Sequence, residues 1–262
     1  MVETMIAVLA GICAGVLTGL NGNSAFGIIP PVLILFLQAD PYAAIGISLA
    51  TDVVSSAVSA GSYFRAGHIH VKTIYPMIVA VVFGTLIGSV ISRYIPSGKL
   101  GESSGILTII IGISFLKKPS LKFFENLREK LVDGSVGKQT RLSVVLFFFM
   151  GIICGVVGFG GGRMIFIILL VVLSFPIHAA VGTAVSVMFF SALSGTVSHI
   201  LFGQITWMVL LTCCTGAALG AALSSRFAAL TSDKILMTLT GFIFIVLGSV
   251  AFAHQLVRGG TP

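Results

Sequence analysis

Long apolar runs, broken by short polar or glycine-rich turns, recur along the whole chain. Ten apolar segments can be drawn: 4–20, 26–37, 42–64, 73–92, 101–116, 142–159, 164–175, 177–202, 205–223 and 235–253. A run of about 18 to 20 apolar residues is long enough to cross a bilayer as a helix. The pattern predicts an all-α polytopic membrane protein with roughly 8–10 membrane segments.

Two of the segments, 26–37 and 164–175, are too short to cross. A dozen residues make roughly 18 Å of helix, whereas the hydrocarbon core is about 30 Å thick. Each short segment follows a polar or glycine-rich turn, and irregular backbone is tolerated at membrane depth only where it is buried in protein or lines a cavity. Short, Gly-interrupted segments at corresponding places in two repeats point to a transporter's binding site. We therefore expect two half-helices that meet at such a site.

The two halves of the chain resemble each other in four places. The matching pairs are Gly11-Ile-Cys-Ala-Gly15-Val16 with Gly151-Ile-Ile-Cys-Gly155-Val156, Ala43-Ala44-Ile45-Gly46 with Ala179-Ala180-Val181-Gly182, Gly67-His68-Ile69 with Gly203-Gln204-Ile205, and Gly84-Thr-Leu-Ile-Gly88 with Gly216-Ala-Ala-Leu-Gly220. Matches in the same order indicate an internal duplication. The predicted organisation is a first membrane repeat over 1–116, a charged cytoplasmic loop over 117–141, and a second membrane repeat over 142–262.

The orientation of the repeats depends on the short segments. If the first two segments of each half enter and return, or both cross, the repeats are inverted. If each pair instead forms one broken helix, the repeats are parallel, and counting Lys and Arg on each side does not separate the two arrangements. We favour inverted repeats, because they suit alternating access around a midplane site.

Composition agrees with a membrane protein and excludes several other classes. Hydrophobic residues make up 56% of the chain and charged residues 9%, whereas soluble domains carry about 25% charged residues. The net charge of +7 is concentrated in the stretch 117–141, which holds seven of the 15 Lys and Arg residues. This is the positive-inside bias of a cytoplasmic loop near anionic lipid, so the expected partners are membrane lipid and not nucleic acid. The four cysteines have no ligand spacing, and we expect neither a metal nor another cofactor.

The Gly158-Phe-Gly-Gly-Gly162 turn, with a weaker copy in the first half, resembles the TauE/SafE family of sulfite exporters. The likeness covers nearly the whole chain: a turn after the first segment of each half, the Ala-Ala-x-Gly opening of the third, the Gly-x-Ile turn after it, and the charged loop. The resemblance implies a multi-pass inner-membrane permease, with sulfite, thiosulfate or organosulfonates as the usual substrates. The first half departs from the family pattern, with Asn21-Gly22-Asn23 where glycines are expected.

The two turns supply the candidate substrate-binding residues: Gly160, Gly161, Gly162 and Arg163 in the second half, and Asn21, Gly22, Asn23 and Ser24 in the first. Free turn amides, a helix N-terminus and a guanidinium together suit an oxyanion. Alternatively, Arg163 snorkels to the interface and contacts water and headgroups. The first turn could bind an anion through neutral amide donors. Alternatively, Asn23 or Ser24 caps the short helix, and these two roles are compatible.

Asp52 is the candidate coupling residue, because it is an acid halfway along the segment 42–64. Ser48, Asp52 and Ser55 recur at three- and four-residue steps and share one helical face. An intramembrane carboxyl group can carry a proton with the anion, or it can be satisfied by neighbouring hydroxyls or by an ion pair with Arg163. Ser48 and Ser55, with Ser186 in the second half, are candidate pathway-lining residues, although small polar faces also serve close helix packing.

The leading interpretation is a secondary carrier of a small sulfur-containing oxyanion such as sulfite, thiosulfate or an organosulfonate, with proton coupling through Asp52. The alternatives are an anion channel that uses the same turns as a filter, and a carrier of a non-sulfur small organic anion. The sequence contains no nucleotide-binding motif, nucleophile turn, His-Glu-x-x-His or paired aspartates, so we expect no enzyme activity.

Overall fold

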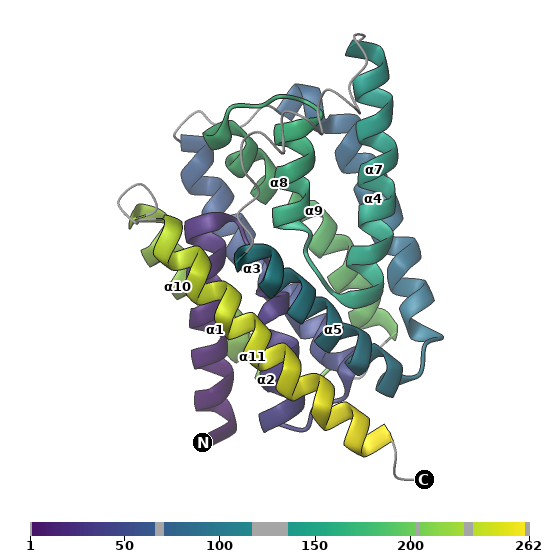
Figure 1. Cartoon of the computed structure of the whole chain (residues 1–262), viewed down its shortest axis with the longest axis vertical. Helices are drawn as coiled ribbons and strands as arrows, with labels where there is room; N and C mark the ends of the chain where they lie inside the picture. Colours follow the sequence, from purple (N-terminus) through teal and green to yellow (C-terminus); the bar gives the residue numbers. More distant parts are fainter. Residues whose placement is uncertain (1, 66–70, 117–135, 203–204, 228–232, 260–262) are drawn as a thin grey trace.

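The computed structural model describes residues 2–65, 71–116, 136–202, 205–227 and 233–259. Within these ranges the chain is helical, as the sequence predicts (Figure 1). The elements are α1 (Val2–Asn21), η1 (Ala25–Gly27), α2 (Ile29–Phe36), α3 (Pro41–Arg65), α4 (Val71–Arg93), α5 (Ser97–Leu116), α7 (Val136–Val157), α8 (Gly162–Val171), α9 (Ile177–Phe202), α10 (Trp207–Phe227) and α11 (Asp233–Gly259).

Six of the helices in the described ranges are long and apolar enough to cross a membrane: α1, α3, α4, α7, α9 and α10. Three shorter apolar stretches accompany them, namely Ala25–Phe36, Gly162–Val171 and Thr240–Leu256. The prediction of a multi-pass helical membrane protein is therefore confirmed. The two stretches that the sequence marks as half-helices are η1 with α2, and α8.

The same backbone turn begins both half-helices. Gly22 and Gly158 take φ angles of 66° and 80°, in the left-handed region that glycine adopts at little cost. Their amides donate to the carbonyls of Thr18 and Cys154, at 2.8 and 2.9 Å. Each long helix therefore ends in a left-handed residue, and the chain turns back inside the protein.

A second kind of turn, again shared by the two halves, ends both half-helices. Gln38 and Ser174 have φ angles of 50° and 56°, and the residue after each donates its amide to a carbonyl six residues earlier, on Leu33 or Leu169, at 3.1 Å. A left-handed residue with such a bond is a common way to end a helix. The two half-helices therefore begin and end with the same backbone conformations.

Helices of one half pair closely with helices of the other (Figure 1). The contacts of Gly11 with the Cys213 carbonyl, and of Gly15 with the Ala217 carbonyl, join α1 to α10. Corresponding glycine contacts join α4 to α7, where Gly88 faces the Ile152 carbonyl. Small residues let the two backbones approach, which is how membrane helices commonly associate. In both pairs the residue numbers rise together, so the paired helices run parallel.

Corresponding helices of the two halves run antiparallel. Gly46 near the start of α3 contacts His199 near the end of α9, and in α5 and α11 Gly101 lies against Gln255 while Gly112 lies against Gly241. In addition, the start of α1 and the end of α2 line the same pocket, through Glu3 and Leu37, so this pair enters and returns. This is the arrangement expected of inverted repeats.

The structure differs from the sequence prediction at the start of the second half. Helix α7 begins at Val136, inside the stretch assigned to the charged loop, and its first turns carry the exposed Lys138 and Arg141. A helix can extend beyond the bilayer when its charged residues face water, and apolarity alone does not mark such an extension. Residues 117–135, the greater part of the predicted loop, lie outside the described residues.

Candidate functional site

The two half-helix turns meet at Ser24. Its hydroxyl oxygen accepts a hydrogen bond of 2.9 Å from the Gly160 amide of the other half, and one of 3.2 Å from the Phe26 amide. Gly162 lies against the Gly22 carbonyl, and the rings of Phe26 and Phe159 pack edge to face with centroids 5.8 Å apart. The residues from 22 to 24 and from 158 to 162 are buried, as irregular backbone at membrane depth requires.

Asp52 of α3 binds directly to this junction. One carboxylate oxygen accepts the Ser24 hydroxyl at 2.5 Å, and the other accepts the Ala25 amide at 2.6 Å. The side chain is fully buried, and a Cβ added to Gly160 would meet the same carboxylate. The acid thus stands at the start of the first half-helix, where free amides and the helix dipole favour negative charge.

The serines that share the face of Asp52 make different hydrogen bonds. Ser55 and Ser56 donate to the Asp52 backbone carbonyl, at 3.4 and 2.5 Å, and do not reach the carboxylate. Ser48 donates to the Gly158 carbonyl at 3.4 Å, which ties α3 to the second turn. Ser186 is half-buried and donates to Gly182 of its own helix at 2.9 Å. Of the candidate pathway residues, Ser48 and Ser55 therefore lie beside the turns and the acid.

Asn23 brings an unused donor to the first turn. Asn23 is 3% exposed, and its side-chain nitrogen has no hydrogen-bond partner among the described residues. A buried unpaired amide costs about 1–3 kcal/mol, so such a group in a native protein calls for an explanation. Asn21 is the last residue of α1, and its side chain lies outside the described residues.

Arg163 lies at the start of α8, but its guanidinium turns toward α5. One of its nitrogens donates to the Ser114 carbonyl at 3.3 Å, in the last turn of that helix. Carbonyls at a helix C-terminus lack intrahelical partners and carry partial negative charge, so a guanidinium stabilises them. The structure therefore brings Gly160, Gly161 and Gly162 to the junction with Ser24, and places the charged group of Arg163 on a neighbouring helix.

Sequence reasoning did not find the Ala25 amide, although it donates the bond to Asp52. A backbone donor has no side-chain signature; only its position after a predicted N-cap serine could have indicated it. The assembled site is a cluster of donors from both halves, the Ser24 hydroxyl and the Ala25 and Gly160 amides, with one acid among them. Donors of this kind bind oxyanions, including carboxylates.

Six candidate membrane spans in the described ranges, with two buried half-helix turns among them, define a multi-pass membrane protein. The profile of the family described as sulfite exporter TauE/SafE matches residues 7–251, and the chain belongs to this family. It is accordingly a membrane transporter of the TauE/SafE type and not an enzyme. The resemblance seen in the sequence is confirmed.

Three relatives carry names that agree with this assignment. The chain is 24% identical over 260 residues to the probable membrane transporter protein YunE of Bacillus subtilis (strain 168), covering 93% of this chain and 95% of the relative. It is 24% identical to the probable membrane transporter protein YdhB of the same organism, covering 88% and 93%. It is 25% identical to the probable membrane transporter protein ORF9 of Sinorhizobium sp, covering 97% and 92%. No solved structure matches the chain.

Proposed function

We propose that this protein is a secondary carrier of a small sulfur-containing oxyanion, and that Asp52 couples its movement to a proton. The family to which the chain belongs, which is described as sulfite exporters, supports this substrate class. The site proposed for it consists of the turns Asn21–Ser24 and Gly160–Gly162.

The observation that carries the proposal is the set of bonds made by Asp52. The carboxylate accepts from Ser24 and Ala25, and Ser24 in turn accepts from Gly160. These are the donors that an anion between the two turns would use. The ionised acid therefore occupies the place of the substrate and competes with it.

The competition is strong because two negative charges share a buried site. At a separation of about 4 Å and an effective dielectric constant near 20, like charges repel by about 4 kcal/mol. A proton on Asp52 removes the repulsion and releases the Ser24 hydroxyl and the Ala25 amide for the anion. The unpaired side-chain amide of Asn23 is a further donor at the same turn.

Transport then follows as the joint movement of an anion and a proton. The site binds the anion when Asp52 is protonated, and departure of the anion lets the ionised carboxylate return to the turn. Alternating access would come from rocking of the two halves about the junction, as in carriers built from inverted repeats. The burial of Asp52 and Ser24 supports a carrier over a channel, because the junction is occluded.

The test is transport by the purified protein in liposomes, with labelled sulfite and thiosulfate. A pH gradient should drive uptake by the wild type. Asp52→Asn should retain exchange of external for internal anion, because a neutral side chain permits anion binding, and should lose the acceleration by the pH gradient. Asp52→Glu, which keeps an ionisable group, should preserve some pH dependence.

Counterflow separates a carrier from a channel in the same liposomes. Preloading with unlabelled sulfite should accelerate entry of the labelled anion, and the rate should saturate. Gradient-driven uptake that survives in Asp52→Asn would remove the coupling role. A non-saturating flux without counterflow would favour the channel, and transport of carboxylates alone would favour a non-sulfur organic anion.

A further inference from the structure

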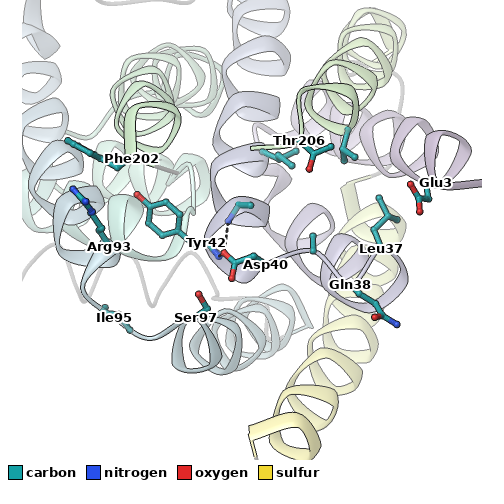
Figure 2. A pocket seen from close by; sticks show the side chains of 14 residues that line it. Glu3, Leu37, Gln38, Asp40, Tyr42, Arg93, Ile95, Ser97, Phe202 and Thr206 are labelled. Carbon is teal, nitrogen blue, oxygen red and sulfur yellow. Dashed lines mark hydrogen bonds between the residues drawn. The ribbon is translucent and has the colours of Figure 1, made fainter. Parts of the chain in front are cut away.

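A pocket of about 610 Å³ opens at the end of the molecule where α3 begins. Its lining comes from the ends of six parts of the chain. They are α1 (Glu3), the turn after α2 (Leu37), α3 (Tyr42), α4 (Arg93), α9 (Phe202) and α10 (Val209). Figure 2 shows Arg93, Tyr42 and Phe202 grouped on one side of the pocket, away from Glu3. The basic and aromatic part is therefore separate from that acid.

The Arg93 guanidinium is positioned by an aromatic ring. Its central carbon lies 5.1 Å from the centroid of the Phe202 ring, a cation–π contact that orients the planar group. Within the described ranges, no carboxylate forms an ion pair with Arg93. A guanidinium offers several donors in a fixed fork that matches the geometry of an oxyanion.

Tyr42 supplies a neutral donor beside this cation. Its ring stacks on His199, with centroids 4.5 Å apart, and its hydroxyl oxygen is buried near Ser92, without a hydrogen bond of normal geometry among the described residues. Figure 2 shows the hydroxyl end of the ring directed toward Arg93. A buried hydroxyl next to a guanidinium suits a small ligand that accepts hydrogen bonds from both.

Asp40, the second acid in the lining, already accepts two hydrogen bonds. The Asp40 carboxylate accepts the amides of Tyr42 at 2.9 Å and Ala43 at 3.2 Å, at the first turn of α3. Because these amides and the helix dipole stabilise its charge, Asp40 opposes an anion less than a free carboxylate would. The lining carries two acids, Glu3 and Asp40, against one cation, so an anion would bind at Arg93, on the side away from Glu3.

The pocket also leads toward the junction of the turns. Its lining includes Ala43 and Ile47 of α3, and Ile47 precedes Asp52 by five residues, which is about 7.5 Å along a helix. Ile47 is 2% exposed, so the lining reaches a buried side chain of the helix that carries Asp52.

We propose that this pocket is an access site, where Arg93 and Tyr42 bind the substrate oxyanion before it reaches the half-helix turns. The inference rests on the proposed function and assigns a second binding position on the same pathway. The ligand is a small oxyanion with at least two acceptor oxygens on one face, as sulfite, thiosulfate and organosulfonates have. Release of Ile47 from its buried position would connect the two sites.

The test compares Arg93→Gln with Lys99→Gln in liposomes, using labelled sulfite at low ionic strength. Both changes remove one exposed cation near the same end of the molecule, but Lys99 does not line the pocket. Arg93→Gln should raise the KM for anion supplied from the pocket side about tenfold, because charge-assisted bonds are lost. Lys99→Gln should change it by less than about twofold, because Lys99 does not line the pocket and would make no bond to an anion bound there. Arg93→Lys, which keeps the charge but not the fork, should fall between the two.

A second measurement reports binding directly. With Cys13 replaced by Ser, Arg93→Cys should react with an impermeant thiol reagent bearing a sulfonate, and sulfite should slow the reaction. Equal KM values for Arg93→Gln and Lys99→Gln, in a protein that transports sulfite, would overturn the access site alone. A wild type that moves none of the sulfur oxyanions would overturn the proposed function and the access site together.

Discussion

Ser24 joins the two halves to the acid with a single hydroxyl. It donates to Asp52 and accepts the amide of Gly160, while its own turn supplies the bond from Phe26. A hydroxyl can fill these roles together, because it has one proton to donate and two lone pairs to accept. The residue that was expected to cap a short helix therefore also links the repeats.

Replacing Ser24 with Ala should impair both stability and transport. The change leaves the Gly160 amide and one Asp52 oxygen unpaired in a buried site, at a cost of about 1–3 kcal/mol. We expect a lower temperature of thermal unfolding in detergent and at least tenfold slower sulfite uptake in liposomes.

Ser24→Thr, which keeps the hydroxyl, should recover most of both properties. Ser103→Ala is the matched control, because the Ser103 hydroxyl donates only to Leu100 of its own helix at 2.9 Å, and it should behave as the wild type. An equal loss in Ser24→Ala and Ser103→Ala would show that the link between the turns has no special role.

Residue patterns located the turns and the acid but not the bonds between them. Asp52 stands out in the sequence because carboxylates inside apolar segments are rare, and the turns stand out because glycines interrupt apolar runs. The bond from Ser24 to Asp52 depends on how α3 packs against the first turn, which no local pattern encodes. The position of Arg163 at the start of a half-helix was predictable from the turn before it, whereas its contact with Ser114 depends on the placement of α5.

Among the elements, the glycine-packed pairs α1 with α10 and α4 with α7 have the closest backbones. Glycines of both partners face carbonyls of the other helix, as Gly84 faces Phe148 and Gly151 faces Val81. By contrast, α3 carries Asp52 and the pocket-lining Tyr42 and Ile47. The pairs therefore suit rigid supports, while α3 connects the two proposed sites.

Adding one methyl group to such a pair should destabilise the protein. A Cβ at Gly88 would meet the Ile152 carbonyl of α7, and forcing extra volume into a packed interface costs about 1–3 kcal/mol. Gly88→Ala should therefore lower the unfolding temperature in detergent.

Gly61→Ala provides the opposite case, because nothing lies within 4 Å of a Cβ at that position of α3. Alanine there should raise stability slightly, by about 0.5–1 kcal/mol from helix propensity. If both variants shift the unfolding temperature in the same direction, close backbone packing does not account for these glycines.

Within the described ranges, the order of the helices was predictable, because hydrophobic runs and turn glycines are local signals. The shortness of α2 and α8 was predictable for the same reason. The pairing of α1 with α10 and of α4 with α7 was not, because a Gly-rich face shows that some helix approaches closely and does not say which one. The pocket at Arg93 likewise combines the ends of helices far apart in the sequence.

At the scale of the whole molecule, the site lies where the two halves meet. Helices α3 and α9, which correspond in the two repeats, contact each other in opposite directions, and the half-helix turns meet beside them. If the halves are inverted repeats, as we propose, the two ends of the molecule have equivalent paths to the centre. The first half departs from this symmetry at Asp52, whose counterpart by the sequence match is Met188. In the proposed mechanism, a single coupling acid would therefore serve both paths.

The orientation of the repeats can be tested at two corresponding turns. Gln38 and Ser174 have matching φ angles and are exposed, so cysteines there report on the same place in each half. With Cys13 replaced by Ser, an impermeant maleimide should label Gln38→Cys in intact cells and Ser174→Cys only after the membrane is opened. The direction follows from the basic stretch 117–141, which should face the cytoplasm, and Gln38 lines the pocket at the other end of α5. Labelling of both cysteines from the same side would instead establish parallel repeats, and the two paths to Asp52 would then not be equivalent.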